Sequence, residues 1–138
     1  MPGLILEGGT LRPIFSAGAL DHLLEQRIRF PYCIGVSAGI SNGVSYISRQ
    51  HGRNLEILKR YRNDSRYFGK RNLFTARSLF GIDFVFGTIP NELMPFDRNA
   101  FLNYDGTILA GVTNAVTGKP EYLDCKEMDE EYTILRAT

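Results

Sequence analysis

The sequence predicts an α/β fold around a mainly parallel sheet, on the basis of three observations. Two short apolar runs, residues 4–6 and 32–36, each lead into a glycine-bearing turn and then into a helical pattern of apolar residues. Short apolar runs of this kind are typical of buried strands in parallel sheets. A third apolar run, residues 107–115, is a further strand. Strands that alternate with helices at these lengths indicate an α/β sandwich.

The first half of the chain contains the clearest helical patterns. After the strand at 4–6, apolar residues recur at helical spacing from Ile14 to Ile28. Pro13 suits the first turn of that helix, because its missing N–H would have no intrahelical partner there. The strand at 32–36 is followed by a predicted helix over residues 38–50, and a third helix is expected over residues 55–61.

The second half of the chain is less regular. Residues 63–99 are rich in aromatic residues, glycine and proline without clean periodicity, which indicates a loop-rich insertion beside the core. The strand at 107–115 is followed by a turn, and residues 120–125 are expected to pair with it. The acidic segment 126–138 is predicted to begin a helix.

Composition restricts the class of protein. With 138 residues, of which 43% are hydrophobic and 22% charged, we expect one globular domain. No apolar run approaches the roughly 18 residues of a membrane span, and the N-terminus lacks the basic segment of a secretory signal. Cys33 and Cys125 are interpreted as reduced thiols of a cytoplasmic protein. Neither they nor His22 and His51 have metal-ligand spacing, so we expect no metal and no cofactor.

Positive charge is concentrated in Arg49–Arg77, which contains nine basic and two acidic residues with four aromatic residues between them. One interpretation is a solvated helix face with long basic side chains. A second is peripheral contact with an anionic membrane surface. Nucleic acid is not expected as a partner, because no nucleic-acid-binding motif accompanies the charge.

The strand at 32–36 ends in the pattern Gly-x-Ser-x-Gly, with Ser37 between Gly35 and Gly39. Between an apolar strand and a helix of small residues, this pattern is typical of a nucleophile on a sharp turn. The glycines allow a tight turn and close packing of the helix. We expect Ser37 to be strained with its Oγ exposed, and the N–H of Ala38 to point at the same oxyanion.

The turn after the first strand, residues 7–13, also presents glycines before a helix. A phosphate cradle is excluded, because neither GxxxxGK[ST] nor GxGxxG is present. Backbone N–H groups at a helix N-terminus have another use, which is to stabilise an oxyanion. That use fits a chain that also offers a nucleophilic serine.

These segments resemble the patatin-like phospholipases in sequence and in order. That family begins with a strand and a loop of the type DGGGxRG, here "EGGTLRP" at residues 7–13. The helix "SAGALDHLLEQ" (16–26) and the elbow "GVSAG" (35–39) follow as in the family. The segments at 112–123 and 134–138 are also similar, so the resemblance covers nearly the whole chain, and it is strongest to bacterial members.

The resemblance implies a three-layer α/β/α sandwich and a serine acyl hydrolase that uses a Ser–Asp dyad. Ser37 would attack an acyl ester, for which a lipid is expected, and water would hydrolyse the acyl-enzyme. The oxyanion hole would involve residues of both turns: Gly8, Gly9, Thr10, Arg12 (as a brace for the loop) and Ala38. Thr10 replaces the third glycine of the family and would be strained if its φ were positive, and Pro13 removes one N–H donor.

The aspartate of the dyad has no counterpart in these 138 residues. In the family it lies in a D-G-[GA] motif downstream of the segment that resembles "ILRAT" (134–138). Asp105 precedes a glycine, but it comes before the strand at 107–115 and is interpreted as a turn residue. Residues 1–138 are therefore expected to be the N-terminal portion of a patatin-like domain, incomplete and inactive alone.

Two other functions stay open at this point. A patatin-fold fragment could bind an anionic membrane or a protein partner without chemistry, as the basic window and the altered loop indicate. An acyltransferase also has a Gly-x-Ser-x-Gly elbow, although that class usually relies on a histidine at its site.

Overall fold

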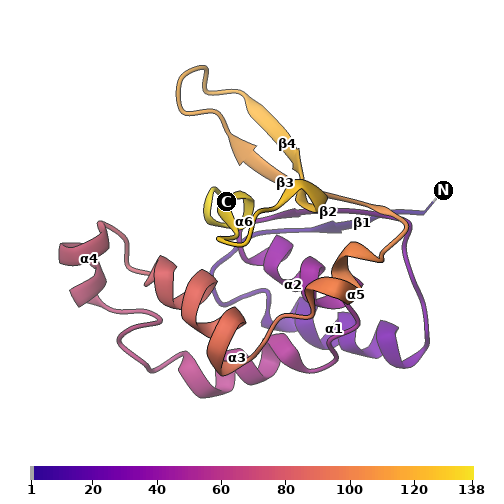
Figure 1. The fold of residues 1–138 in the computed structure, drawn as a ribbon, viewed down its shortest axis with the longest axis horizontal. Coiled ribbons are helices and arrows are strands. Elements are labelled where there is room, and N and C mark those ends of the chain that lie inside the picture. The colour runs from indigo at the N-terminus through magenta and orange to yellow at the C-terminus, as the bar shows by residue number, and fades with distance from the viewer. Residues whose placement is uncertain (1) are drawn as a thin grey trace.

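The computed structural model describes residues 2–138, apart from the side chains of residues 75 and 76. Strands and helices alternate through the first third of the chain, and a series of separate helices then precedes the last two strands (Figure 1). The elements in chain order are β1 (Leu4–Leu6), α1 (Ile14–Glu25), β2 (Tyr32–Val36), α2 (Ala38–Ile47), α3 (Arg53–Tyr61), α4 (Lys70–Ala76), η1 (Phe84–Leu93), α5 (Arg98–Leu102), β3 (Thr107–Thr113), β4 (Pro120–Asp124), η2 (Cys125–Glu127) and α6 (Thr133–Arg136).

The four strands form one sheet in the order β1-β2-β3-β4. β1, β2 and β3 are parallel, and β4 runs antiparallel to β3 at the edge. In the parallel part Leu6 lies opposite Gly35, so the carboxyl ends of β1 and β2 are level. The α/β fold around a mainly parallel sheet is therefore confirmed, and the strand bounds at 4–6 and 32–36 agree with the predicted ones.

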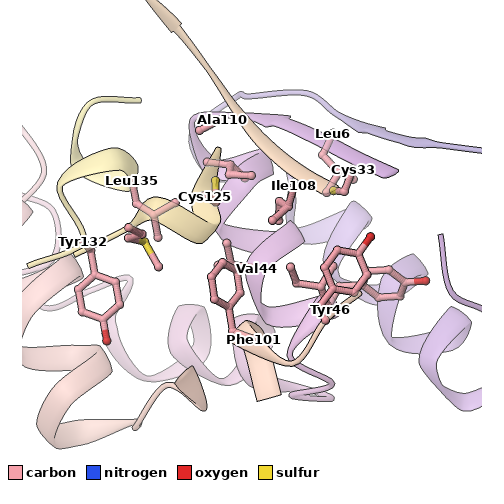
Figure 2. Packing of buried hydrophobic residues seen from close by; sticks show 14 of the residues in the cluster. Leu6, Cys33, Val44, Tyr46, Phe101, Ile108, Ala110, Cys125, Tyr132 and Leu135 are labelled. Atoms are coloured by element: carbon pink, nitrogen blue, oxygen red, sulfur yellow. The ribbon is translucent and has the colours of Figure 1, made fainter. Parts of the chain in front are cut away.

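One face of the sheet packs on α2 and forms the centre of the core. Leu6, Cys33 and Ile108 point from three neighbouring strands toward Val44 of α2, as Figure 2 shows. Alternate residues point to the opposite face, where Ile5 is 79% exposed and Val36 is 45% exposed. This alternation follows from the period of two along a strand.

Helix α2 is buried on nearly all sides, which its small and apolar residues permit. It lies between the sheet and helices α1 and α3 (Figure 1). Two buried hydroxyl groups find hydrogen-bond acceptors within the protein. Ser48 Oγ donates to Val44 O of α2 itself (2.7 Å), and Ser45 Oγ donates to Asn54 Oδ1 of α3 (2.9 Å).

The prediction of a loop-rich insertion at residues 63–99 is wrong in one respect, because this stretch contains the ten-residue helix η1. η1 is a wide π-type helix that contains Pro90, and Met94 N donates to Ile89 O five residues earlier (2.8 Å). Apolar residues along such a helix do not recur at the 3.6-residue spacing of an α-helix. Phe84 and Ile89 of η1 form a second apolar cluster with Tyr67. The segment therefore packs as a small core of its own.

The helix predicted over residues 126–138 is also shorter than expected. The chain forms the single turn η2 and then the four-residue helix α6. Tyr132 precedes α6 with φ 59°, a left-handed conformation that interrupts a continuous helix. Leu135 of α6 joins the main core beside Cys125 (Figure 2).

Candidate active site

Ser37 occupies the turn between β2 and α2 with φ 52° and ψ −130°. Residues other than glycine rarely adopt a positive φ, and conformations of this kind cost about 1–3 kcal/mol when the surroundings impose them. The side chain is half-buried at the carboxyl end of the sheet. The strained backbone agrees with the conformation that the Gly-x-Ser-x-Gly pattern predicts.

The two glycines of this turn are required by close backbone approaches. A Cβ on Gly39 would lie 2.4 Å from the carbonyl oxygens of Leu6 and Glu7, and a Cβ on Gly35 would lie 2.5 Å from Ile40 Cα. Neither glycine has a positive φ. Space, rather than conformational freedom, therefore demands glycine, since the start of α2 touches both β1 and β2 through the backbone.

The loop after β1 lies directly against the Ser37 turn. A Cβ on Gly8 would lie 3.1 Å from Ser37 Cβ and 3.3 Å from Val36 O. This contact follows from the sheet register, because parallel strands with level carboxyl ends place their following loops side by side. The fold thus brings together the two glycine-bearing turns, which are about 30 residues apart in sequence.

The conformation of this loop matches the departures seen in the sequence. Gly9 has φ 139° and Thr10 has φ 59°, so the β-branched Thr10 is in a left-handed conformation. Arg12 folds back over Gly9, where its Nε would lie 2.9 Å from an added Cβ, and Arg12 N donates to Gly9 O (3.0 Å). Arg12 therefore contacts the loop, and its role as a brace stays a prediction.

Several backbone donors beside Ser37 are without a protein acceptor. Within residues 2–138, the N–H groups of Gly9, Thr10 and Ala38 donate to no protein atom. Ala38 is the first residue of α2, so its N–H also lies at the positive end of the helix dipole. Donors of this kind are what a negatively charged oxygen near Ser37 would require.

Asn42 is a site residue that the sequence analysis did not identify. It is buried on α2, five residues after Ser37, and its Nδ2 donates to the carbonyl oxygen of Pro13 (2.7 Å). The bond ties the loop that contains Gly9 and Thr10 to the helix that begins at Ser37. The sequence feature that could have identified it is an asparagine within a predicted helix of small and apolar residues, because a buried amide requires a hydrogen-bond partner.

A cavity of about 340 Å³ opens beside Ser37. Its volume lies within the range of small-molecule sites. Thr10, Ser37 and Ser41 line one part of it, and most of the remaining wall is apolar. That wall comes from α3, from the segment 78–90 and from α6: Ile57, Leu58, Phe80, Ile82, Val85, Phe86, Ile89, Pro90 and Leu135. The segment predicted as an insertion beside the core therefore supplies much of the cavity wall.

No Asp, Glu or His side chain of the described residues lines the cavity. His22 and His51 instead share Glu25 on the surface, with N–O distances of 3.3 and 3.1 Å. Hydrogen bonds from His51 and then His22 lower the pKa of Glu25. Asp105 is exposed before the amino end of β3, at the end of the sheet opposite to Ser37. None of these residues is placed to accept a proton from Ser37.

The family profile described as patatin-like phospholipase matches residues 4–131, a range that includes both turns and all four strands. The chain belongs to the patatin-like phospholipase family. This patatin-like chain is also 30% identical over 83 residues to the uncharacterized protein YjjU of Escherichia coli K12. That alignment covers 59% of the chain and 23% of YjjU, so the chain spans under a quarter of that relative. No solved structure gave a significant match.

The basic residues of the window Arg49–Arg77 do not form one surface in the folded chain. Glu56 pairs with Lys59 and Arg60, and Arg66 binds Asp64 (2.7 Å) with its guanidinium 4.4 Å from the Phe84 ring centre. Arg53 is turned inward and lines the cavity.

Helix α4 projects at one end of the molecule (Figure 1), where Phe74 is 88% exposed. No helix in the described part of the chain combines the length and apolar character needed to cross a bilayer. Within the same residues, no group of three or more His, Cys, Asp or Glu side chains is arranged to hold a metal ion.

Proposed function

We propose that this chain carries the nucleophile and the oxyanion site of a lipid acyl hydrolase, with Ser37 as the nucleophile. Membership of the patatin-like phospholipase family supports hydrolysis of lipids at the level of the family. The observation that carries the assignment to Ser37 is its contact with the Gly8 loop in the wall of a largely apolar cavity. This combination places a hydroxyl, unpaired N–H donors and space for an acyl chain in one region.

The proposed reaction proceeds through an acyl-enzyme. Ser37 Oγ attacks the ester carbonyl carbon as its proton passes to a carboxylate base, and the carbonyl oxygen becomes an oxyanion. The N–H groups of Gly9, Thr10 and Ala38 stabilise that oxyanion. Its collapse expels the alcohol, which takes up the proton, and a water molecule then hydrolyses the acyl-serine by the same steps.

The base is the part of the dyad that the cavity wall does not contain. Because no Asp, Glu or His of the described residues lines the cavity, we assign this role to an aspartate beyond them, as the family resemblance implies. We expect the 138-residue chain alone to show little or no ester turnover, since a serine hydroxyl without a base is a weak nucleophile.

Ester hydrolysis by a longer polypeptide tests this function. A protein of the length of the YjjU relative should hydrolyse short p-nitrophenyl esters, and Ser37→Ala should abolish the activity. Ser41→Ala is the matched control, because Ser41 also lines the cavity but lies one helical turn further along α2. Activity that survives Ser37→Ala would exclude Ser37 as the nucleophile, and so would fluorophosphonate labelling at another serine.

A second candidate function is binding to an anionic membrane without chemistry. The observation that favours it is the surface of α4, where Leu73 and Phe74 are exposed beside Lys70. Exposed apolar residues flanked by basic ones are typical of interfacial contact. The same surface would also suit a hydrolase that acts at a membrane, since residues 78–82 connect α4 to the cavity wall.

Vesicle binding tests the contact with an anionic membrane, and the ester assay decides whether chemistry accompanies it. The chain is mixed either with vesicles that contain an anionic lipid or with vesicles of neutral phosphatidylcholine alone. We expect the protein to sediment with the anionic vesicles and to do so less at high salt. Phe74→Ser should weaken this binding, whereas Phe15→Ser is the control, because Phe15 is 84% exposed but belongs to α1, outside the basic window in sequence. Equal binding to both vesicle types would refute the electrostatic contribution.

A further inference from the structure

Arg53 is a partly buried cation without a counter-ion. It is the first residue of α3, and its Nε is inaccessible to solvent and has no hydrogen-bond partner. Among residues 2–138, no carboxylate lies within ion-pair distance of its guanidinium. By contrast, Arg136, another arginine of the same cavity wall, binds Asp83 at 2.6 Å.

The protein satisfies only part of the hydrogen-bonding capacity of Arg53. A guanidinium carries five N–H groups. Nη2 donates to Met94 O at 2.9 Å, and Nη1 makes a long contact with Ser45 Oγ at 3.4 Å. The face of the group lies 5.6 Å from the centre of the Phe96 ring, which is an attractive contact but accepts no N–H. Both terminal nitrogens therefore keep a donor for a further acceptor.

A charge that is partly removed from water and has no counter-ion is energetically unfavourable. Burial lowers the pKa of Arg53, an effect that Tyr132 only partly opposes. Arginine nevertheless stays protonated, so the charge remains in the wall of the cavity. Buried charges in proteins are generally paired with an opposite charge or with a ligand. An anion that enters the cavity would supply both the missing charge and the missing acceptor.

The surroundings of Arg53 define what kind of anion fits. Arg53 lines the same 340 Å³ cavity as Ser37, and its neighbour Asn54 adds an amide to the wall. Ile57 and Leu58, one turn further along α3, are apolar. The ligand therefore needs a negative group at the start of α3 and an apolar part along the rest of the wall.

We propose that Arg53 binds a phosphate or carboxylate group of the substrate, so that the acyl ester presented to Ser37 belongs to an anionic amphiphile. The part of this inference that concerns the substrate of the reaction rests on the proposed function of Ser37. Binding itself does not require the reaction, because the guanidinium is in place without the base of the dyad. Arginine forms paired hydrogen bonds with both kinds of anion, which makes it suited to this role.

Ligand binding by the 138-residue chain tests the proposal without turnover. Three probes with the same alkyl chain, n-octyl phosphate, octanoate and 1-octanol, are titrated calorimetrically. We expect at least one anionic probe to bind about tenfold tighter than 1-octanol, or more, since a charged hydrogen bond contributes on the order of one tenfold step or two. The tighter of the two anions identifies the group as phosphate or carboxylate.

Matched variants assign the effect to Arg53. Arg53→Gln should remove the preference for the anion, whereas Arg62→Gln, which removes the same charge from an exposed position just after α3, should keep it. Ser37→Ala should also keep it, so that failure of Ser37 as nucleophile leaves this result unchanged. The proposal is overturned if the three probes bind equally, or if Arg53→Gln leaves the preference intact.

A spectroscopic measurement on the unmodified chain makes the test independent of whether Arg53→Gln folds. The buried Nε–H of Arg53 should give a distinct side-chain resonance in an ¹H–¹⁵N spectrum, which Arg53→Lys identifies by its loss. Titration with the tighter anion should shift this resonance with the same saturation curve as the calorimetry, and an unchanged resonance would overturn the proposal.

Discussion

Replacement of Gly39 by alanine tests the central feature of the candidate site, which is the direct backbone contact between the Ser37 turn and β1. The added Cβ would lie 2.4 Å from two carbonyl oxygens, those of Leu6 and Glu7. Separations below 3.0 Å essentially never occur for real Cβ atoms. Because both oxygens belong to the backbone, no side-chain rotation can relieve the contact, and α2 must move away from β1.

Two opposing effects set the size of the change. Alanine is favoured over glycine inside a helix by about 1 kcal/mol. Overpacking of a well-packed site costs typically 1–3 kcal/mol and occasionally more, and a contact with fixed backbone lies at the high end of that range. The expected net loss is about 2 kcal/mol in the free energy of unfolding, or roughly 8 °C in Tm for a chain of this size.

Urea and thermal unfolding followed by circular dichroism measure this change, with Gly18→Ala as the matched control. Gly18 also lies within a helix, α1, but a Cβ there would meet nothing within 4 Å. Gly18→Ala should therefore raise the free energy of unfolding by about 0.5–1 kcal/mol. If Gly39→Ala were as stable as the unmodified chain or more so, the close approach of the two turns would be refuted.

Three further predictions concern the same site and the core. Thr10→Gly should stabilise the chain by up to about 1 kcal/mol, because it relieves the left-handed φ of 59°, and lower stability in urea unfolding would contradict this. Asn42→Ala should cost about 0.5–1.5 kcal/mol, because it removes a buried hydrogen bond to Pro13 O, which keeps only the bond from Ala17 N, and a neutral effect would remove Asn42 from its positioning role. Burial raises the pKa of Cys33 and Cys125 from 9.0 to about 12, so the thiols of the unfolded chain ionise first. Their contribution to the free energy of unfolding should be fully present below about pH 8 and fall above about pH 9, and a flat profile between about pH 9 and pH 11 would argue against buried thiols.

Local features of the site could be predicted from the sequence because they depend on neighbouring residues. The strand at 32–36, the turn at Ser37 and the helix that follows are specified by one apolar run, two glycines and a set of small residues. The strain at Thr10 was likewise foreseeable from a β-branched residue in a glycine position. The roles of these residues in catalysis stay predictions until Ser37 is tested.

The composition of the cavity could not be predicted in the same way. Its wall combines α3, residues 78–90 and α6, and the π-type helix η1 within it has no α-helical period to detect. Arg53 was indistinguishable in sequence from the eight other basic residues of its window. Its inward orientation follows from packing against Phe96 and Met94, which lie some 40 residues away.

The sequence by itself therefore determined the strands, the Ser37 turn and the family to which the chain belongs, since these depend on short-range patterns of apolar residues and glycines. Only the tertiary structure decided that the Gly8 loop lies against Ser37, because that contact depends on the pairing of β1 with β2. It also decided that Arg53 faces the cavity rather than solvent. Both are long-range contacts, and the packing of the whole chain selects them.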